Sequence, residues 1–374
     1  MTSFCDTHIL AFFKEWNAST PLDVALSHYF RAHKSLGARD RRDVGQTVYT
    51  LIRFKSLFEA LDPTTSKQLF LLRKHPLEYW QQDRSLPEPA RYGMPEFLFE
   101  QLLNIYGPET GRSLARILNT QAPTAVRANL LKISREALLS QWESQFQLRP
   151  AAETPAGILF SKREPLFALD AFKQGLFEVQ DIGSQRVAAL IQAKPGDRVL
   201  DFCSGSGGKA LAIAPQMQGK GELYLHDIRT HSLEEAKRRL RRAGVQNAQI
   251  LPSEHPTLKK LLGQMNWVLA DVPCSGTGTL RRNPDMKWKI DQPMIEQLVV
   301  KQRAIVKEAL RYVRTDGGKL VYATCSVLPQ ENETQVEEFL KTLPVELVQE
   351  PLKLLPEEGG GDGFFAAVFK KKIR

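Results

Sequence analysis

The stretch RVLDFCSGSGGKA, residues 198–210, decides the fold of the second half of this 374-residue chain. A short apolar run ends in an acidic residue, Asp201, and a glycine-rich turn follows it into a helical segment. Glycines at the N-terminus of a helix let the backbone approach a ligand closely. A strand, a glycine turn and a helix in this order are typical of the first unit of a ligand-binding α/β domain.

The rest of the chain after residue 176 repeats this alternation of strand and helix. Helical stretches such as SLEEAKRRLRRAG and residues 292–312 separate short apolar runs, which are RVLDFC, ELYLHD, NAQIL, NWVLADV and KLVYATC. Such alternation indicates a mostly parallel sheet covered on both faces. We therefore predict a doubly wound, Rossmann-like α/β domain over residues 176–374, with GFFAAVFKKK as a final edge strand.

Two further regions precede this domain. Residues 1–85 have helical periodicity and carry basic side chains along one segment, which are Arg31, Lys34, Arg39, Arg41, Arg42 and Arg53. Residues 95–175 combine two helical runs, FLFEQLLNIYG and TGRSLARILN, with two candidate strands, TAVRANLL and GILFSK. We predict a helical N-terminal domain, a Pro-rich linker and a small α+β module. The basic face of the first region is either solvated or a nucleic-acid contact.

Composition restricts the classes of binding partner and the cellular setting that we expect for this chain. The net charge of +9 favours polyanions, because each neutralised phosphate releases counterions. No run approaches the roughly 20 apolar residues that a membrane span needs, and the N-terminus does not resemble a signal peptide. The four cysteines lie far apart without CxxC spacing, so neither a metal site nor a disulfide framework is expected. We expect a cytoplasmic protein with free thiols, and a monomer.

The acidic residues around the glycine turn restrict its ligand. Asp227 ends the second strand, at the distance where a carboxylate meets ribose hydroxyls. The turn matches neither GxGxxG nor the phosphate loop GxxxxGK[ST]. A sulfonium ligand without phosphate suits Asp201 better than a pyrophosphate does. We therefore predict S-adenosylmethionine, the alternative being a tight turn that binds nothing.

Two cysteines follow the fourth and fifth strands, in ADVPCSGTGTLRRNPDMKWK and YATCSVLPQENE. A lone cysteine is most often a small buried hydrophobe, but Cys274 and Cys325 both lie where ligands bind in open sheets. A thiolate that adds to C6 of a pyrimidine activates C5 for attack on a methyl group. Proton transfer then needs a second group, and Asp271 is placed to hold the base. Nearby cations are expected to lower a cysteine pKa and to hold phosphate, or else to be solvated; they are Lys209, Arg281, Arg282 and Lys287.

These motifs resemble those of a known family, the RsmB/Nop/Sun-type RNA (cytosine-5) methyltransferases. DFCSGSGGK is similar to the family's DxCAAPGGKT, DVPCSGTGTLRRNPDMKW to DxPCSGxGxxRRxPDxKW, and YATCSVLPQENE to YxTCSxxxxENE. FEVQDIGSQRVAALI and DGFFAAVFKKK also resemble family segments, and the resemblance covers roughly residues 95–374. The short N-terminal helical region is similar to the extension of bacterial rRNA-type members.

The resemblance implies a role for each matching residue. Cys325 would attack C6, Cys274 would promote release of the methylated RNA, and Asp271 would hold the cytosine with Lys209 close by. The module at 95–175 would bind RNA, as would four residues of the PCS motif, Arg281, Arg282, Asn283 and Lys287. The cofactor would be held by residues from four loops, which are Cys203, Ser204, Gly205, Ser206, Gly207, Gly208, Lys209, Asp227, Ser253 and Asp271. Cys5 and Cys203 are expected to be structural thiols.

Two departures from the family pattern stand out. Ser206 replaces the rigid proline of AAPGG, and PSEH offers Ser253 and Glu254 where an acidic residue is expected after the third strand. The predicted substrate is an RNA, with 16S rRNA as first choice and tRNA as the alternative. A methyltransferase acting on a protein or small molecule would need neither cysteine motif. A noncatalytic RNA-binding or ribosome-assembly factor is supported only by the altered glycine loop.

Overall fold

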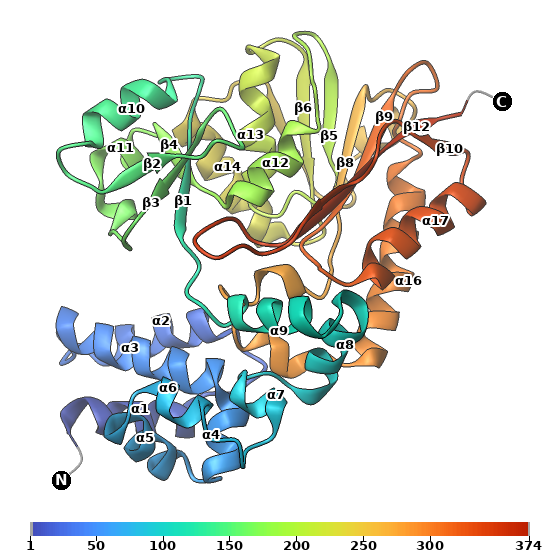
Figure 1. Cartoon of the computed structure of the whole chain (residues 1–374). Helices are drawn as coiled ribbons and strands as arrows, with labels where there is room; N and C mark the ends of the chain where they lie inside the picture. The colour runs from blue at the N-terminus through green and yellow to red at the C-terminus, as the bar shows by residue number, and fades with distance from the viewer. Residues whose placement is uncertain (1–2, 373–374) are drawn as a thin grey trace. The chain divides into compact units, whose positions relative to one another are not determined.

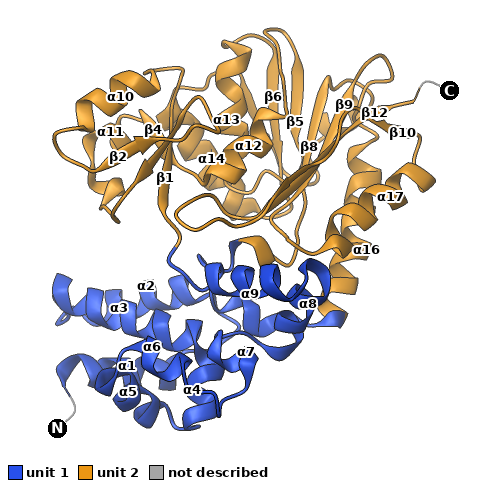
Figure 2. Cartoon of the chain, in the orientation of Figure 1, with its two compact units in different colours: residues 1–121, 279–292 blue, residues 122–278, 293–374 orange. Residues whose placement is uncertain are grey.

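A computed structural model describes residues 3–372 of the chain. The chain divides into two compact units, shown in different colours in Figure 2. The first unit comprises Met1–Gln121 and Thr279–Gln292, and the second comprises Ala122–Gly278 and Pro293–Arg374. The chain thus leaves the second unit at Gly278 and returns to it at Pro293.

The first unit is helical in its described residues. Its core is built from the apolar faces of the first five helices, and Phe12, Val48 and Phe58 are among the side chains buried there. The predicted helices of residues 1–85 and those of FLFEQLLNIYG and TGRSLARILN are confirmed, and the predicted linker contains two short helices. The helices are α1 Phe4–Glu15, α2 Leu22–Ala32, α3 Ala38–Arg53, α4 Lys55–Leu61, α5 Thr65–Lys74, α6 Leu77–Gln81, α7 Glu88–Arg91, α8 Glu96–Tyr106 and α9 Pro108–Ile117.

Residues 279–292 complete this helical unit. They include the short helix η3 (Met286–Lys289), and Trp288 packs against the helical core. The Trp288 indole donates a hydrogen bond to the Ile52 carbonyl at 2.7 Å. The Lys287 ammonium donates to the Arg53 carbonyl and to the Asn119 side-chain oxygen, both at 2.5 Å. Since those groups belong to the ends of α3 and α9, the segment ties two helix ends together.

A small antiparallel sheet opens the second unit. Its strand order is β2-β3-β1-β4, and Trp142, Phe160 and Phe177 fill the core beneath it. The predicted strands in TAVRANLL and GILFSK are confirmed as β1 and β3. The elements are β1 Thr124–Ala128, α10 Arg135–Trp142, β2 Leu148–Pro150, β3 Gly157–Phe160, η1 Leu166–Ala168, α11 Asp170–Lys173 and β4 Phe177–Val179.

The large sheet of this unit has the order β10-β12-β9-β8-β5-β6-β7, and β11 pairs with β12. Figure 1 labels β6, β5, β8, β9, β12 and β10 in this sheet. Strands β5 to β9 are parallel, which confirms the predicted doubly wound sheet. The strands are β5 Arg198–Asp201, β6 Glu222–His226, β7 Ala248–Leu251, β8 Trp267–Asp271, β9 Lys319–Thr324, β10 Val345–Leu347, β11 Leu352–Leu354 and β12 Phe364–Lys371. The helices are α12 Ile182–Ala189, α13 Gly208–Met217, α14 Thr230–Ala243, α15 Thr257–Lys260, α16 Gln292–Ala309 and α17 Glu333–Thr342, with the short turns η2 Thr277–Thr279 and η4 Pro329–Glu331.

Both faces of this sheet are buried. Side chains alternate between the faces along each strand, so Val268 and Ala270 of β8 join one core while Leu269 joins the other. Helices α13 and α14 cover the Leu269 face, and α16 and α17 cover the opposite face. Burial of each such aliphatic side chain stabilises the fold by roughly 1.5–3 kcal/mol. The continuous apolar strands of the sequence follow from this double burial.

The position predicted for the last strand was wrong. GFFAAVFKKK forms β12, but β12 lies inside the sheet, antiparallel to β9 on one side and to β10 and β11 on the other. Its side chains from Phe364 to Phe369 are all buried, which an edge strand with one open side would not require. The short strands β10 and β11, which were not predicted, form the outer border instead.

Candidate active site

Three aspartates converge at the carboxyl ends of the central strands. Asp201 ends β5, Asp271 ends β8, and Asp227 follows β6. From β5 the chain proceeds to β6 on one side, and it returns to β8 on the other side of β5. This reversal creates a crevice beyond the strand ends, which is where open α/β sheets bind their ligands. The predicted cofactor loop therefore lies at the switch point of the sheet.

The glycine loop is held against the end of β6. The Asp227 carboxylate accepts a hydrogen bond from the Gly205 amide at 2.8 Å, and the Ser204 amide donates to the His226 carbonyl at 2.9 Å. Burial alone would raise the pKa of Asp227, but donors from Arg229 and the Gly205 amide outweigh burial and lower it. Asp227 is therefore an anionic acceptor beside the loop.

Gly207 allows the loop to pass directly into α13. Its φ is +79°, and a Cβ there would lie 3.1 Å from Leu225 and 3.2 Å from Ala236. We expect Gly207→Ala to reduce the free energy of unfolding by about 1–3 kcal/mol, since a left-handed alanine is strained and must also displace both neighbours. The matched control is Gly208→Ala, whose Cβ would meet no atom closer than 3.8 Å. Equal melting temperatures of the two variants would contradict this account.

Asp201 is a buried carboxyl group without a strong partner. Among the described residues neither of its oxygens has a well-formed hydrogen bond, and the Ala210 amide gives only a weak one. Burial and the nearby Asp271 raise the pKa of Asp201 to about 8. The Ser204 hydroxyl is also buried without a partner. Unsatisfied acceptors of this kind fit a ligand that brings positive charge and donors, and they do not fit a pyrophosphate.

The raised pKa makes stability depend on pH. A carboxyl group whose pKa rises on folding holds its proton more tightly in the folded chain. Its contribution is full below the unfolded value of about 3.9 and is lost as the pH rises toward about 8. Without cofactor, the melting temperature should therefore fall relative to that of Asp201→Asn between pH 5.5 and pH 8, and the difference should level off above. Asp316→Asn, at an exposed position, is the control. Parallel curves for Asp201→Asn and the parent would count against the raised pKa.

Lys209 and Asp271 form an ion pair across the crevice. The Lys209 ammonium lies 2.5 Å from Asp271 Oδ2, and the side chains are 10% and 29% exposed. Burial opposes the charge on Lys209, but the Asp271 carboxylate outweighs it and raises the lysine pKa. The charge of Cys325 also raises the pKa of the Lys209 ammonium, which indicates that the ion pair lies beside that cysteine. Lys209 is therefore engaged by a carboxylate and is not available as a simple phosphate ligand.

The structure brings the two predicted cysteines together. Cys274 Sγ and Cys325 Sγ are 3.3 Å apart, and the Cys325 amide donates to Cys274 Sγ at 3.3 Å. The hydrogen bond from Cys325 and burial raise the pKa of Cys274 well above its usual value. This direction is opposite to the lowering expected from nearby cations, because the group that Cys274 contacts is a second thiol. Cys274 therefore remains a protonated thiol that can donate to a thiolate at Cys325.

A buried carboxylate, Glu331, holds the loops that carry both cysteines. Its Oε2 accepts a 2.5 Å bond from the Ser275 hydroxyl, and its Oε1 accepts from the Ser275 amide at 2.8 Å and from Gln302 at 3.0 Å. The Tyr322 hydroxyl donates to the Glu331 carbonyl at 2.6 Å.

The second glycine of PCSGTG, Gly278, is required by packing. A side chain there would collide with the carbonyl of Gly363.

The predicted RNA-binding residues lie in the first unit, and two of them are buried. Arg281 and Lys287 are 2% and 1% exposed. Burial and the repulsion of Arg53 lower the Lys287 pKa well below its usual value. Arg282 is half-buried, and Asn283 is exposed. Lys287 thus serves the internal packing of the helical unit, whereas among the four predicted residues Asn283 and part of Arg282 are open to solvent.

Several residues of the site were not singled out in the sequence. Glu331 belongs to the quoted ENE motif, which was the available signal, whereas nothing in the sequence distinguished Arg229 and Arg239 from the many other arginines.

The remaining predicted residues lie in the loops at the strand ends. Ser253 and Glu254 are exposed beyond β7. Cys203 is half-buried in the glycine loop, where burial raises its pKa. Within residues 3–372 no group of three or more His, Cys, Asp or Glu side chains is arranged to hold a metal, and no helix has the length and apolarity to cross a membrane.

A doubly wound sheet with three carboxylates and a glycine turn at its switch point defines the class of S-adenosylmethionine-dependent methyltransferases. Residues 188–370 match the family model described as 16S rRNA methyltransferase RsmB/F, and residues 94–166 match that of the RsmF/B-like ferredoxin-like domain. The ribosomal RNA small subunit methyltransferase B of Escherichia coli O6:K15:H31 is 34% identical over 309 residues, which are 78% of this chain and 70% of that protein. The chain therefore belongs to the RsmB/F methyltransferase family, and its methyl donor is S-adenosylmethionine.

Solved structures share the fold. The crystal structure of PH0851 has a TM-score of 0.81 with 22% identity, covering 99% of this chain and 98% of its own. A methyltransferase homolog protein from Pyrococcus horikoshii has a TM-score of 0.67 with 25% identity, covering 76% of this chain and 97% of its own. Both likenesses agree with the doubly wound domain described above.

Proposed function

We propose that this protein transfers a methyl group to C5 of a cytosine in 16S rRNA through a covalent adduct between Cys325 and C6 of the base. The observation that carries the proposal is the pair of thiols 3.3 Å apart at the ends of β8 and β9, beside the Lys209–Asp271 ion pair. A methyltransferase acting on an oxygen or nitrogen atom needs no thiol, since such atoms are nucleophilic enough to attack a methyl sulfonium directly.

The two cysteines divide the chemistry between them. The Cys325 thiolate forms a bond to C6, and the electron pair of the C5–C6 double bond becomes available at C5. S-adenosylmethionine, when bound, supplies the electrophilic methyl group that C5 takes up. Loss of the C5 proton to a base then restores the double bond as the Cys325–C6 bond breaks. Cys274 would assist this release as a donor to the leaving thiolate, and the 3.3 Å between its sulfur and that of Cys325 supports this role.

The ion pair and the glycine loop position the reactants in this proposal. The Asp271 carboxylate, 29% exposed, would accept from the cytosine amino group while Lys209 stabilises negative charge near Cys325. Asp227 would accept from ribose hydroxyls, and residues 203–209 would surround the methionine moiety. Asp201 and Ser204, which lack strong partners, would face the positive charge of the cofactor.

The RNA substrate rests on the relatives and on charge. The relatives are named ribosomal RNA small subunit methyltransferase B, and the chain has a net charge of +9. We propose that the helical region 1–85, the module at 95–175, and Arg282 with Asn283 contribute to RNA binding. A surface rich in arginine supplies sequence-independent contacts to phosphate.

The test uses the purified protein, labelled S-adenosylmethionine and RNA from cells that lack the gene. The RNA is separated into 16S rRNA, 23S rRNA and tRNA, and each fraction is digested to nucleosides for mass spectrometry. Labelled 5-methylcytidine in 16S rRNA alone supports the proposal. The same product in tRNA alone replaces the substrate, a different methylated nucleoside overturns the cysteine chemistry, and no product from folded protein favours a noncatalytic RNA-binding factor.

The target cytosine is expected to be unpaired or flipped out of its helix. C6 is stacked between neighbouring bases in a duplex, so a thiolate cannot approach it there. Short RNAs that carry the target cytosine in a loop should therefore be methylated at least about tenfold faster than the same sequence paired with a complement. Single-turnover rates measure the difference, and equal rates would contradict the need for an accessible base.

A further inference from the structure

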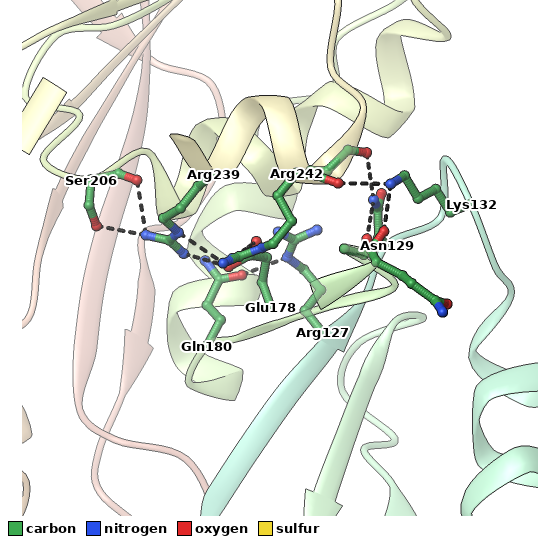
Figure 3. A network of polar contacts seen from close by, with 11 residues as sticks. Arg127, Asn129, Lys132, Glu178, Gln180, Ser206, Arg239 and Arg242 are labelled. Atoms are coloured by element: carbon green, nitrogen blue, oxygen red, sulfur yellow. Dashed lines mark hydrogen bonds and ion pairs between the residues drawn. The ribbon is translucent and has the colours of Figure 1, made fainter. Parts of the chain in front are cut away.

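One arginine connects the small sheet to the cofactor loop. Arg239 of α14 donates through Nη1 to the Ser206 hydroxyl at 2.6 Å and to the Ser206 carbonyl at 2.9 Å (Figure 3). Through its other nitrogens it contacts Glu178 Oε2, with the Nη2–Oε2 distance at 3.0 Å. Glu178 belongs to β4, so three elements far apart in the sequence meet at one guanidinium.

The ion pair between Arg239 and Glu178 is shielded from solvent and supported from a second side. The side chains of Arg239 and Glu178 are 14% and 4% exposed, so solvent screens their interaction only weakly. Glu178 is held from a second side by Arg242, whose Nη2 lies 2.5 Å from Oε1. Charge-assisted hydrogen bonds between buried groups are shorter and stronger than neutral ones, and an arginine fork fixes direction as well as distance.

A parallel connection reaches the next turn of the loop. The side-chain amide nitrogen of Gln180 donates to the Gly208 carbonyl at 3.1 Å. The side-chain oxygen of Gln180 accepts from Arg127 Nε of β1 at 2.7 Å. Both connections therefore run from the small sheet to residues 206–208. Figure 3 shows Glu178, Gln180 and Arg127 of this region together with Arg239 and Ser206. The loop is therefore held at Ser206 and Gly208, where it passes into α13.

We propose that Glu178, Arg239 and Ser206 form a positioning element that holds the cofactor loop, replacing the rigidity that a proline supplies in the AAPGG pattern. A proline restricts the backbone covalently, whereas serine leaves it free and costs more entropy when the loop is ordered around a ligand. The Arg239 fork fixes the Ser206 hydroxyl and carbonyl together and so restricts the same residue from outside. This inference rests on the proposed role of residues 203–209 as the cofactor loop.

The experiment asks whether proline and Arg239 substitute for each other in the full chain. Arg239→Met keeps a long stem but removes the donors, and Glu178 retains Arg242 as its partner. Arg238→Met is the matched control, because Arg238 is 70% exposed and pairs only locally with Glu235. Ser206→Ala removes the hydroxyl contact alone. Ser206→Pro removes no main-chain hydrogen bond, since among the described residues the Ser206 amide donates none.

Three readouts separate positioning from general stability. Calorimetry gives the Kd for S-adenosylmethionine, hydrogen exchange of amides 204–209 in cofactor-free protein gives loop order, and melting temperatures report the fold. We expect Arg239→Met to raise Kd about tenfold and Ser206→Ala about threefold, with Arg238→Met unchanged. In a Ser206→Pro background Arg239→Met should raise Kd less than about threefold. KM for the cofactor should rise while kcat stays near its original value.

The outcomes distinguish this inference from the proposed function. If Arg239→Met raises Kd equally in the parent and in the Ser206→Pro background, Arg239 acts independently of Ser206. If Arg239→Met leaves Kd unchanged in both backgrounds, Arg239 does not position the cofactor loop. If Arg239→Met does not fold, the Ser206→Ala result decides by itself. If the parent protein binds no S-adenosylmethionine, the proposed function fails. Faster hydrogen exchange of amides 204–209 in Arg239→Met would then still support the positioning element of Glu178, Arg239 and Ser206.

Discussion

Cys325→Ser is expected to lower the single-turnover rate of methyl transfer by roughly 10⁴-fold or more, which is the scale seen when a covalent nucleophile is removed. A serine hydroxyl is far less acidic than a thiol and cannot form an anion within reach of C6. The neighbouring sulfur of Cys274, 3.3 Å away, is not expected to replace it, because burial and the charge of Glu331, which remain in this variant, still raise the Cys274 pKa.

The measurement for Cys325→Ser is transfer of labelled methyl to the RNA fraction that the parent methylates. Binding of S-adenosylmethionine and of RNA should stay within about threefold of the parent, since neither depends on the bond to C6. Cys5→Ser, in the helical unit, is the control for a thiol outside the site. Transfer by Cys325→Ser at a rate near that of the parent would mean that another group attacks the base, and the roles of the two cysteines would have to be exchanged.

The second large effect is expected from Cys274→Ala, which should accumulate the covalent protein–RNA adduct. Removing the thiol that contacts Cys325 Sγ leaves the leaving thiolate without its donor and slows breakage of the bond to C6. Most of the protein should therefore migrate as a slower band on a denaturing gel after incubation with RNA and S-adenosylmethionine. Nuclease treatment should return that band to the position of the free protein.

The double variant Cys274→Ala with Cys325→Ser is the control for this adduct, because it lacks the attacking sulfur and should show no slow band. Cys5→Ser, whose thiol lies in the helical unit, should behave like the parent. A Cys274→Ala protein that turns over normally and forms no adduct would show that product release needs no second thiol.

The sequence predicted those parts of the fold and site that depend on short-range pattern. Strand ends, glycine turns and the two cysteine motifs are local signals, and the sheet order brings Cys274 and Cys325 together because parallel strands end at one edge. The family resemblance also implied that Lys209 lies close to Asp271, and the two residues form an ion pair.

What the sequence did not reveal depends on contacts between distant segments. Arg281 and Lys287 look like solvated cations in RRNPDMKWK, yet both are buried. Arg53 donates to the Arg281 carbonyl, and Lys287 donates to the Arg53 carbonyl and to Asn119, so this segment packs against residues more than 150 positions earlier. The expected lowering of a cysteine pKa was wrong for Cys274 for a similar reason, since its partner across the sheet is a thiol. Arg239 resembled its neighbours in KRRLRR, and only the register of α14 against β4 distinguishes it.

The segment 279–292 has a consequence for the order of events on the ribosome. Helices α1 to α9 of the helical unit are synthesised before the second unit, but Trp288 and Lys287, which complete its packing, are made only after most of the second unit. At about 5–20 residues per second, the interval between Gln121 and Gln292 is roughly 10–30 s. During that time the carbonyls of Ile52 and Arg53 lack the donors that they have in the finished protein. These contacts of the helical unit can therefore form only after the end of the PCS motif has been synthesised.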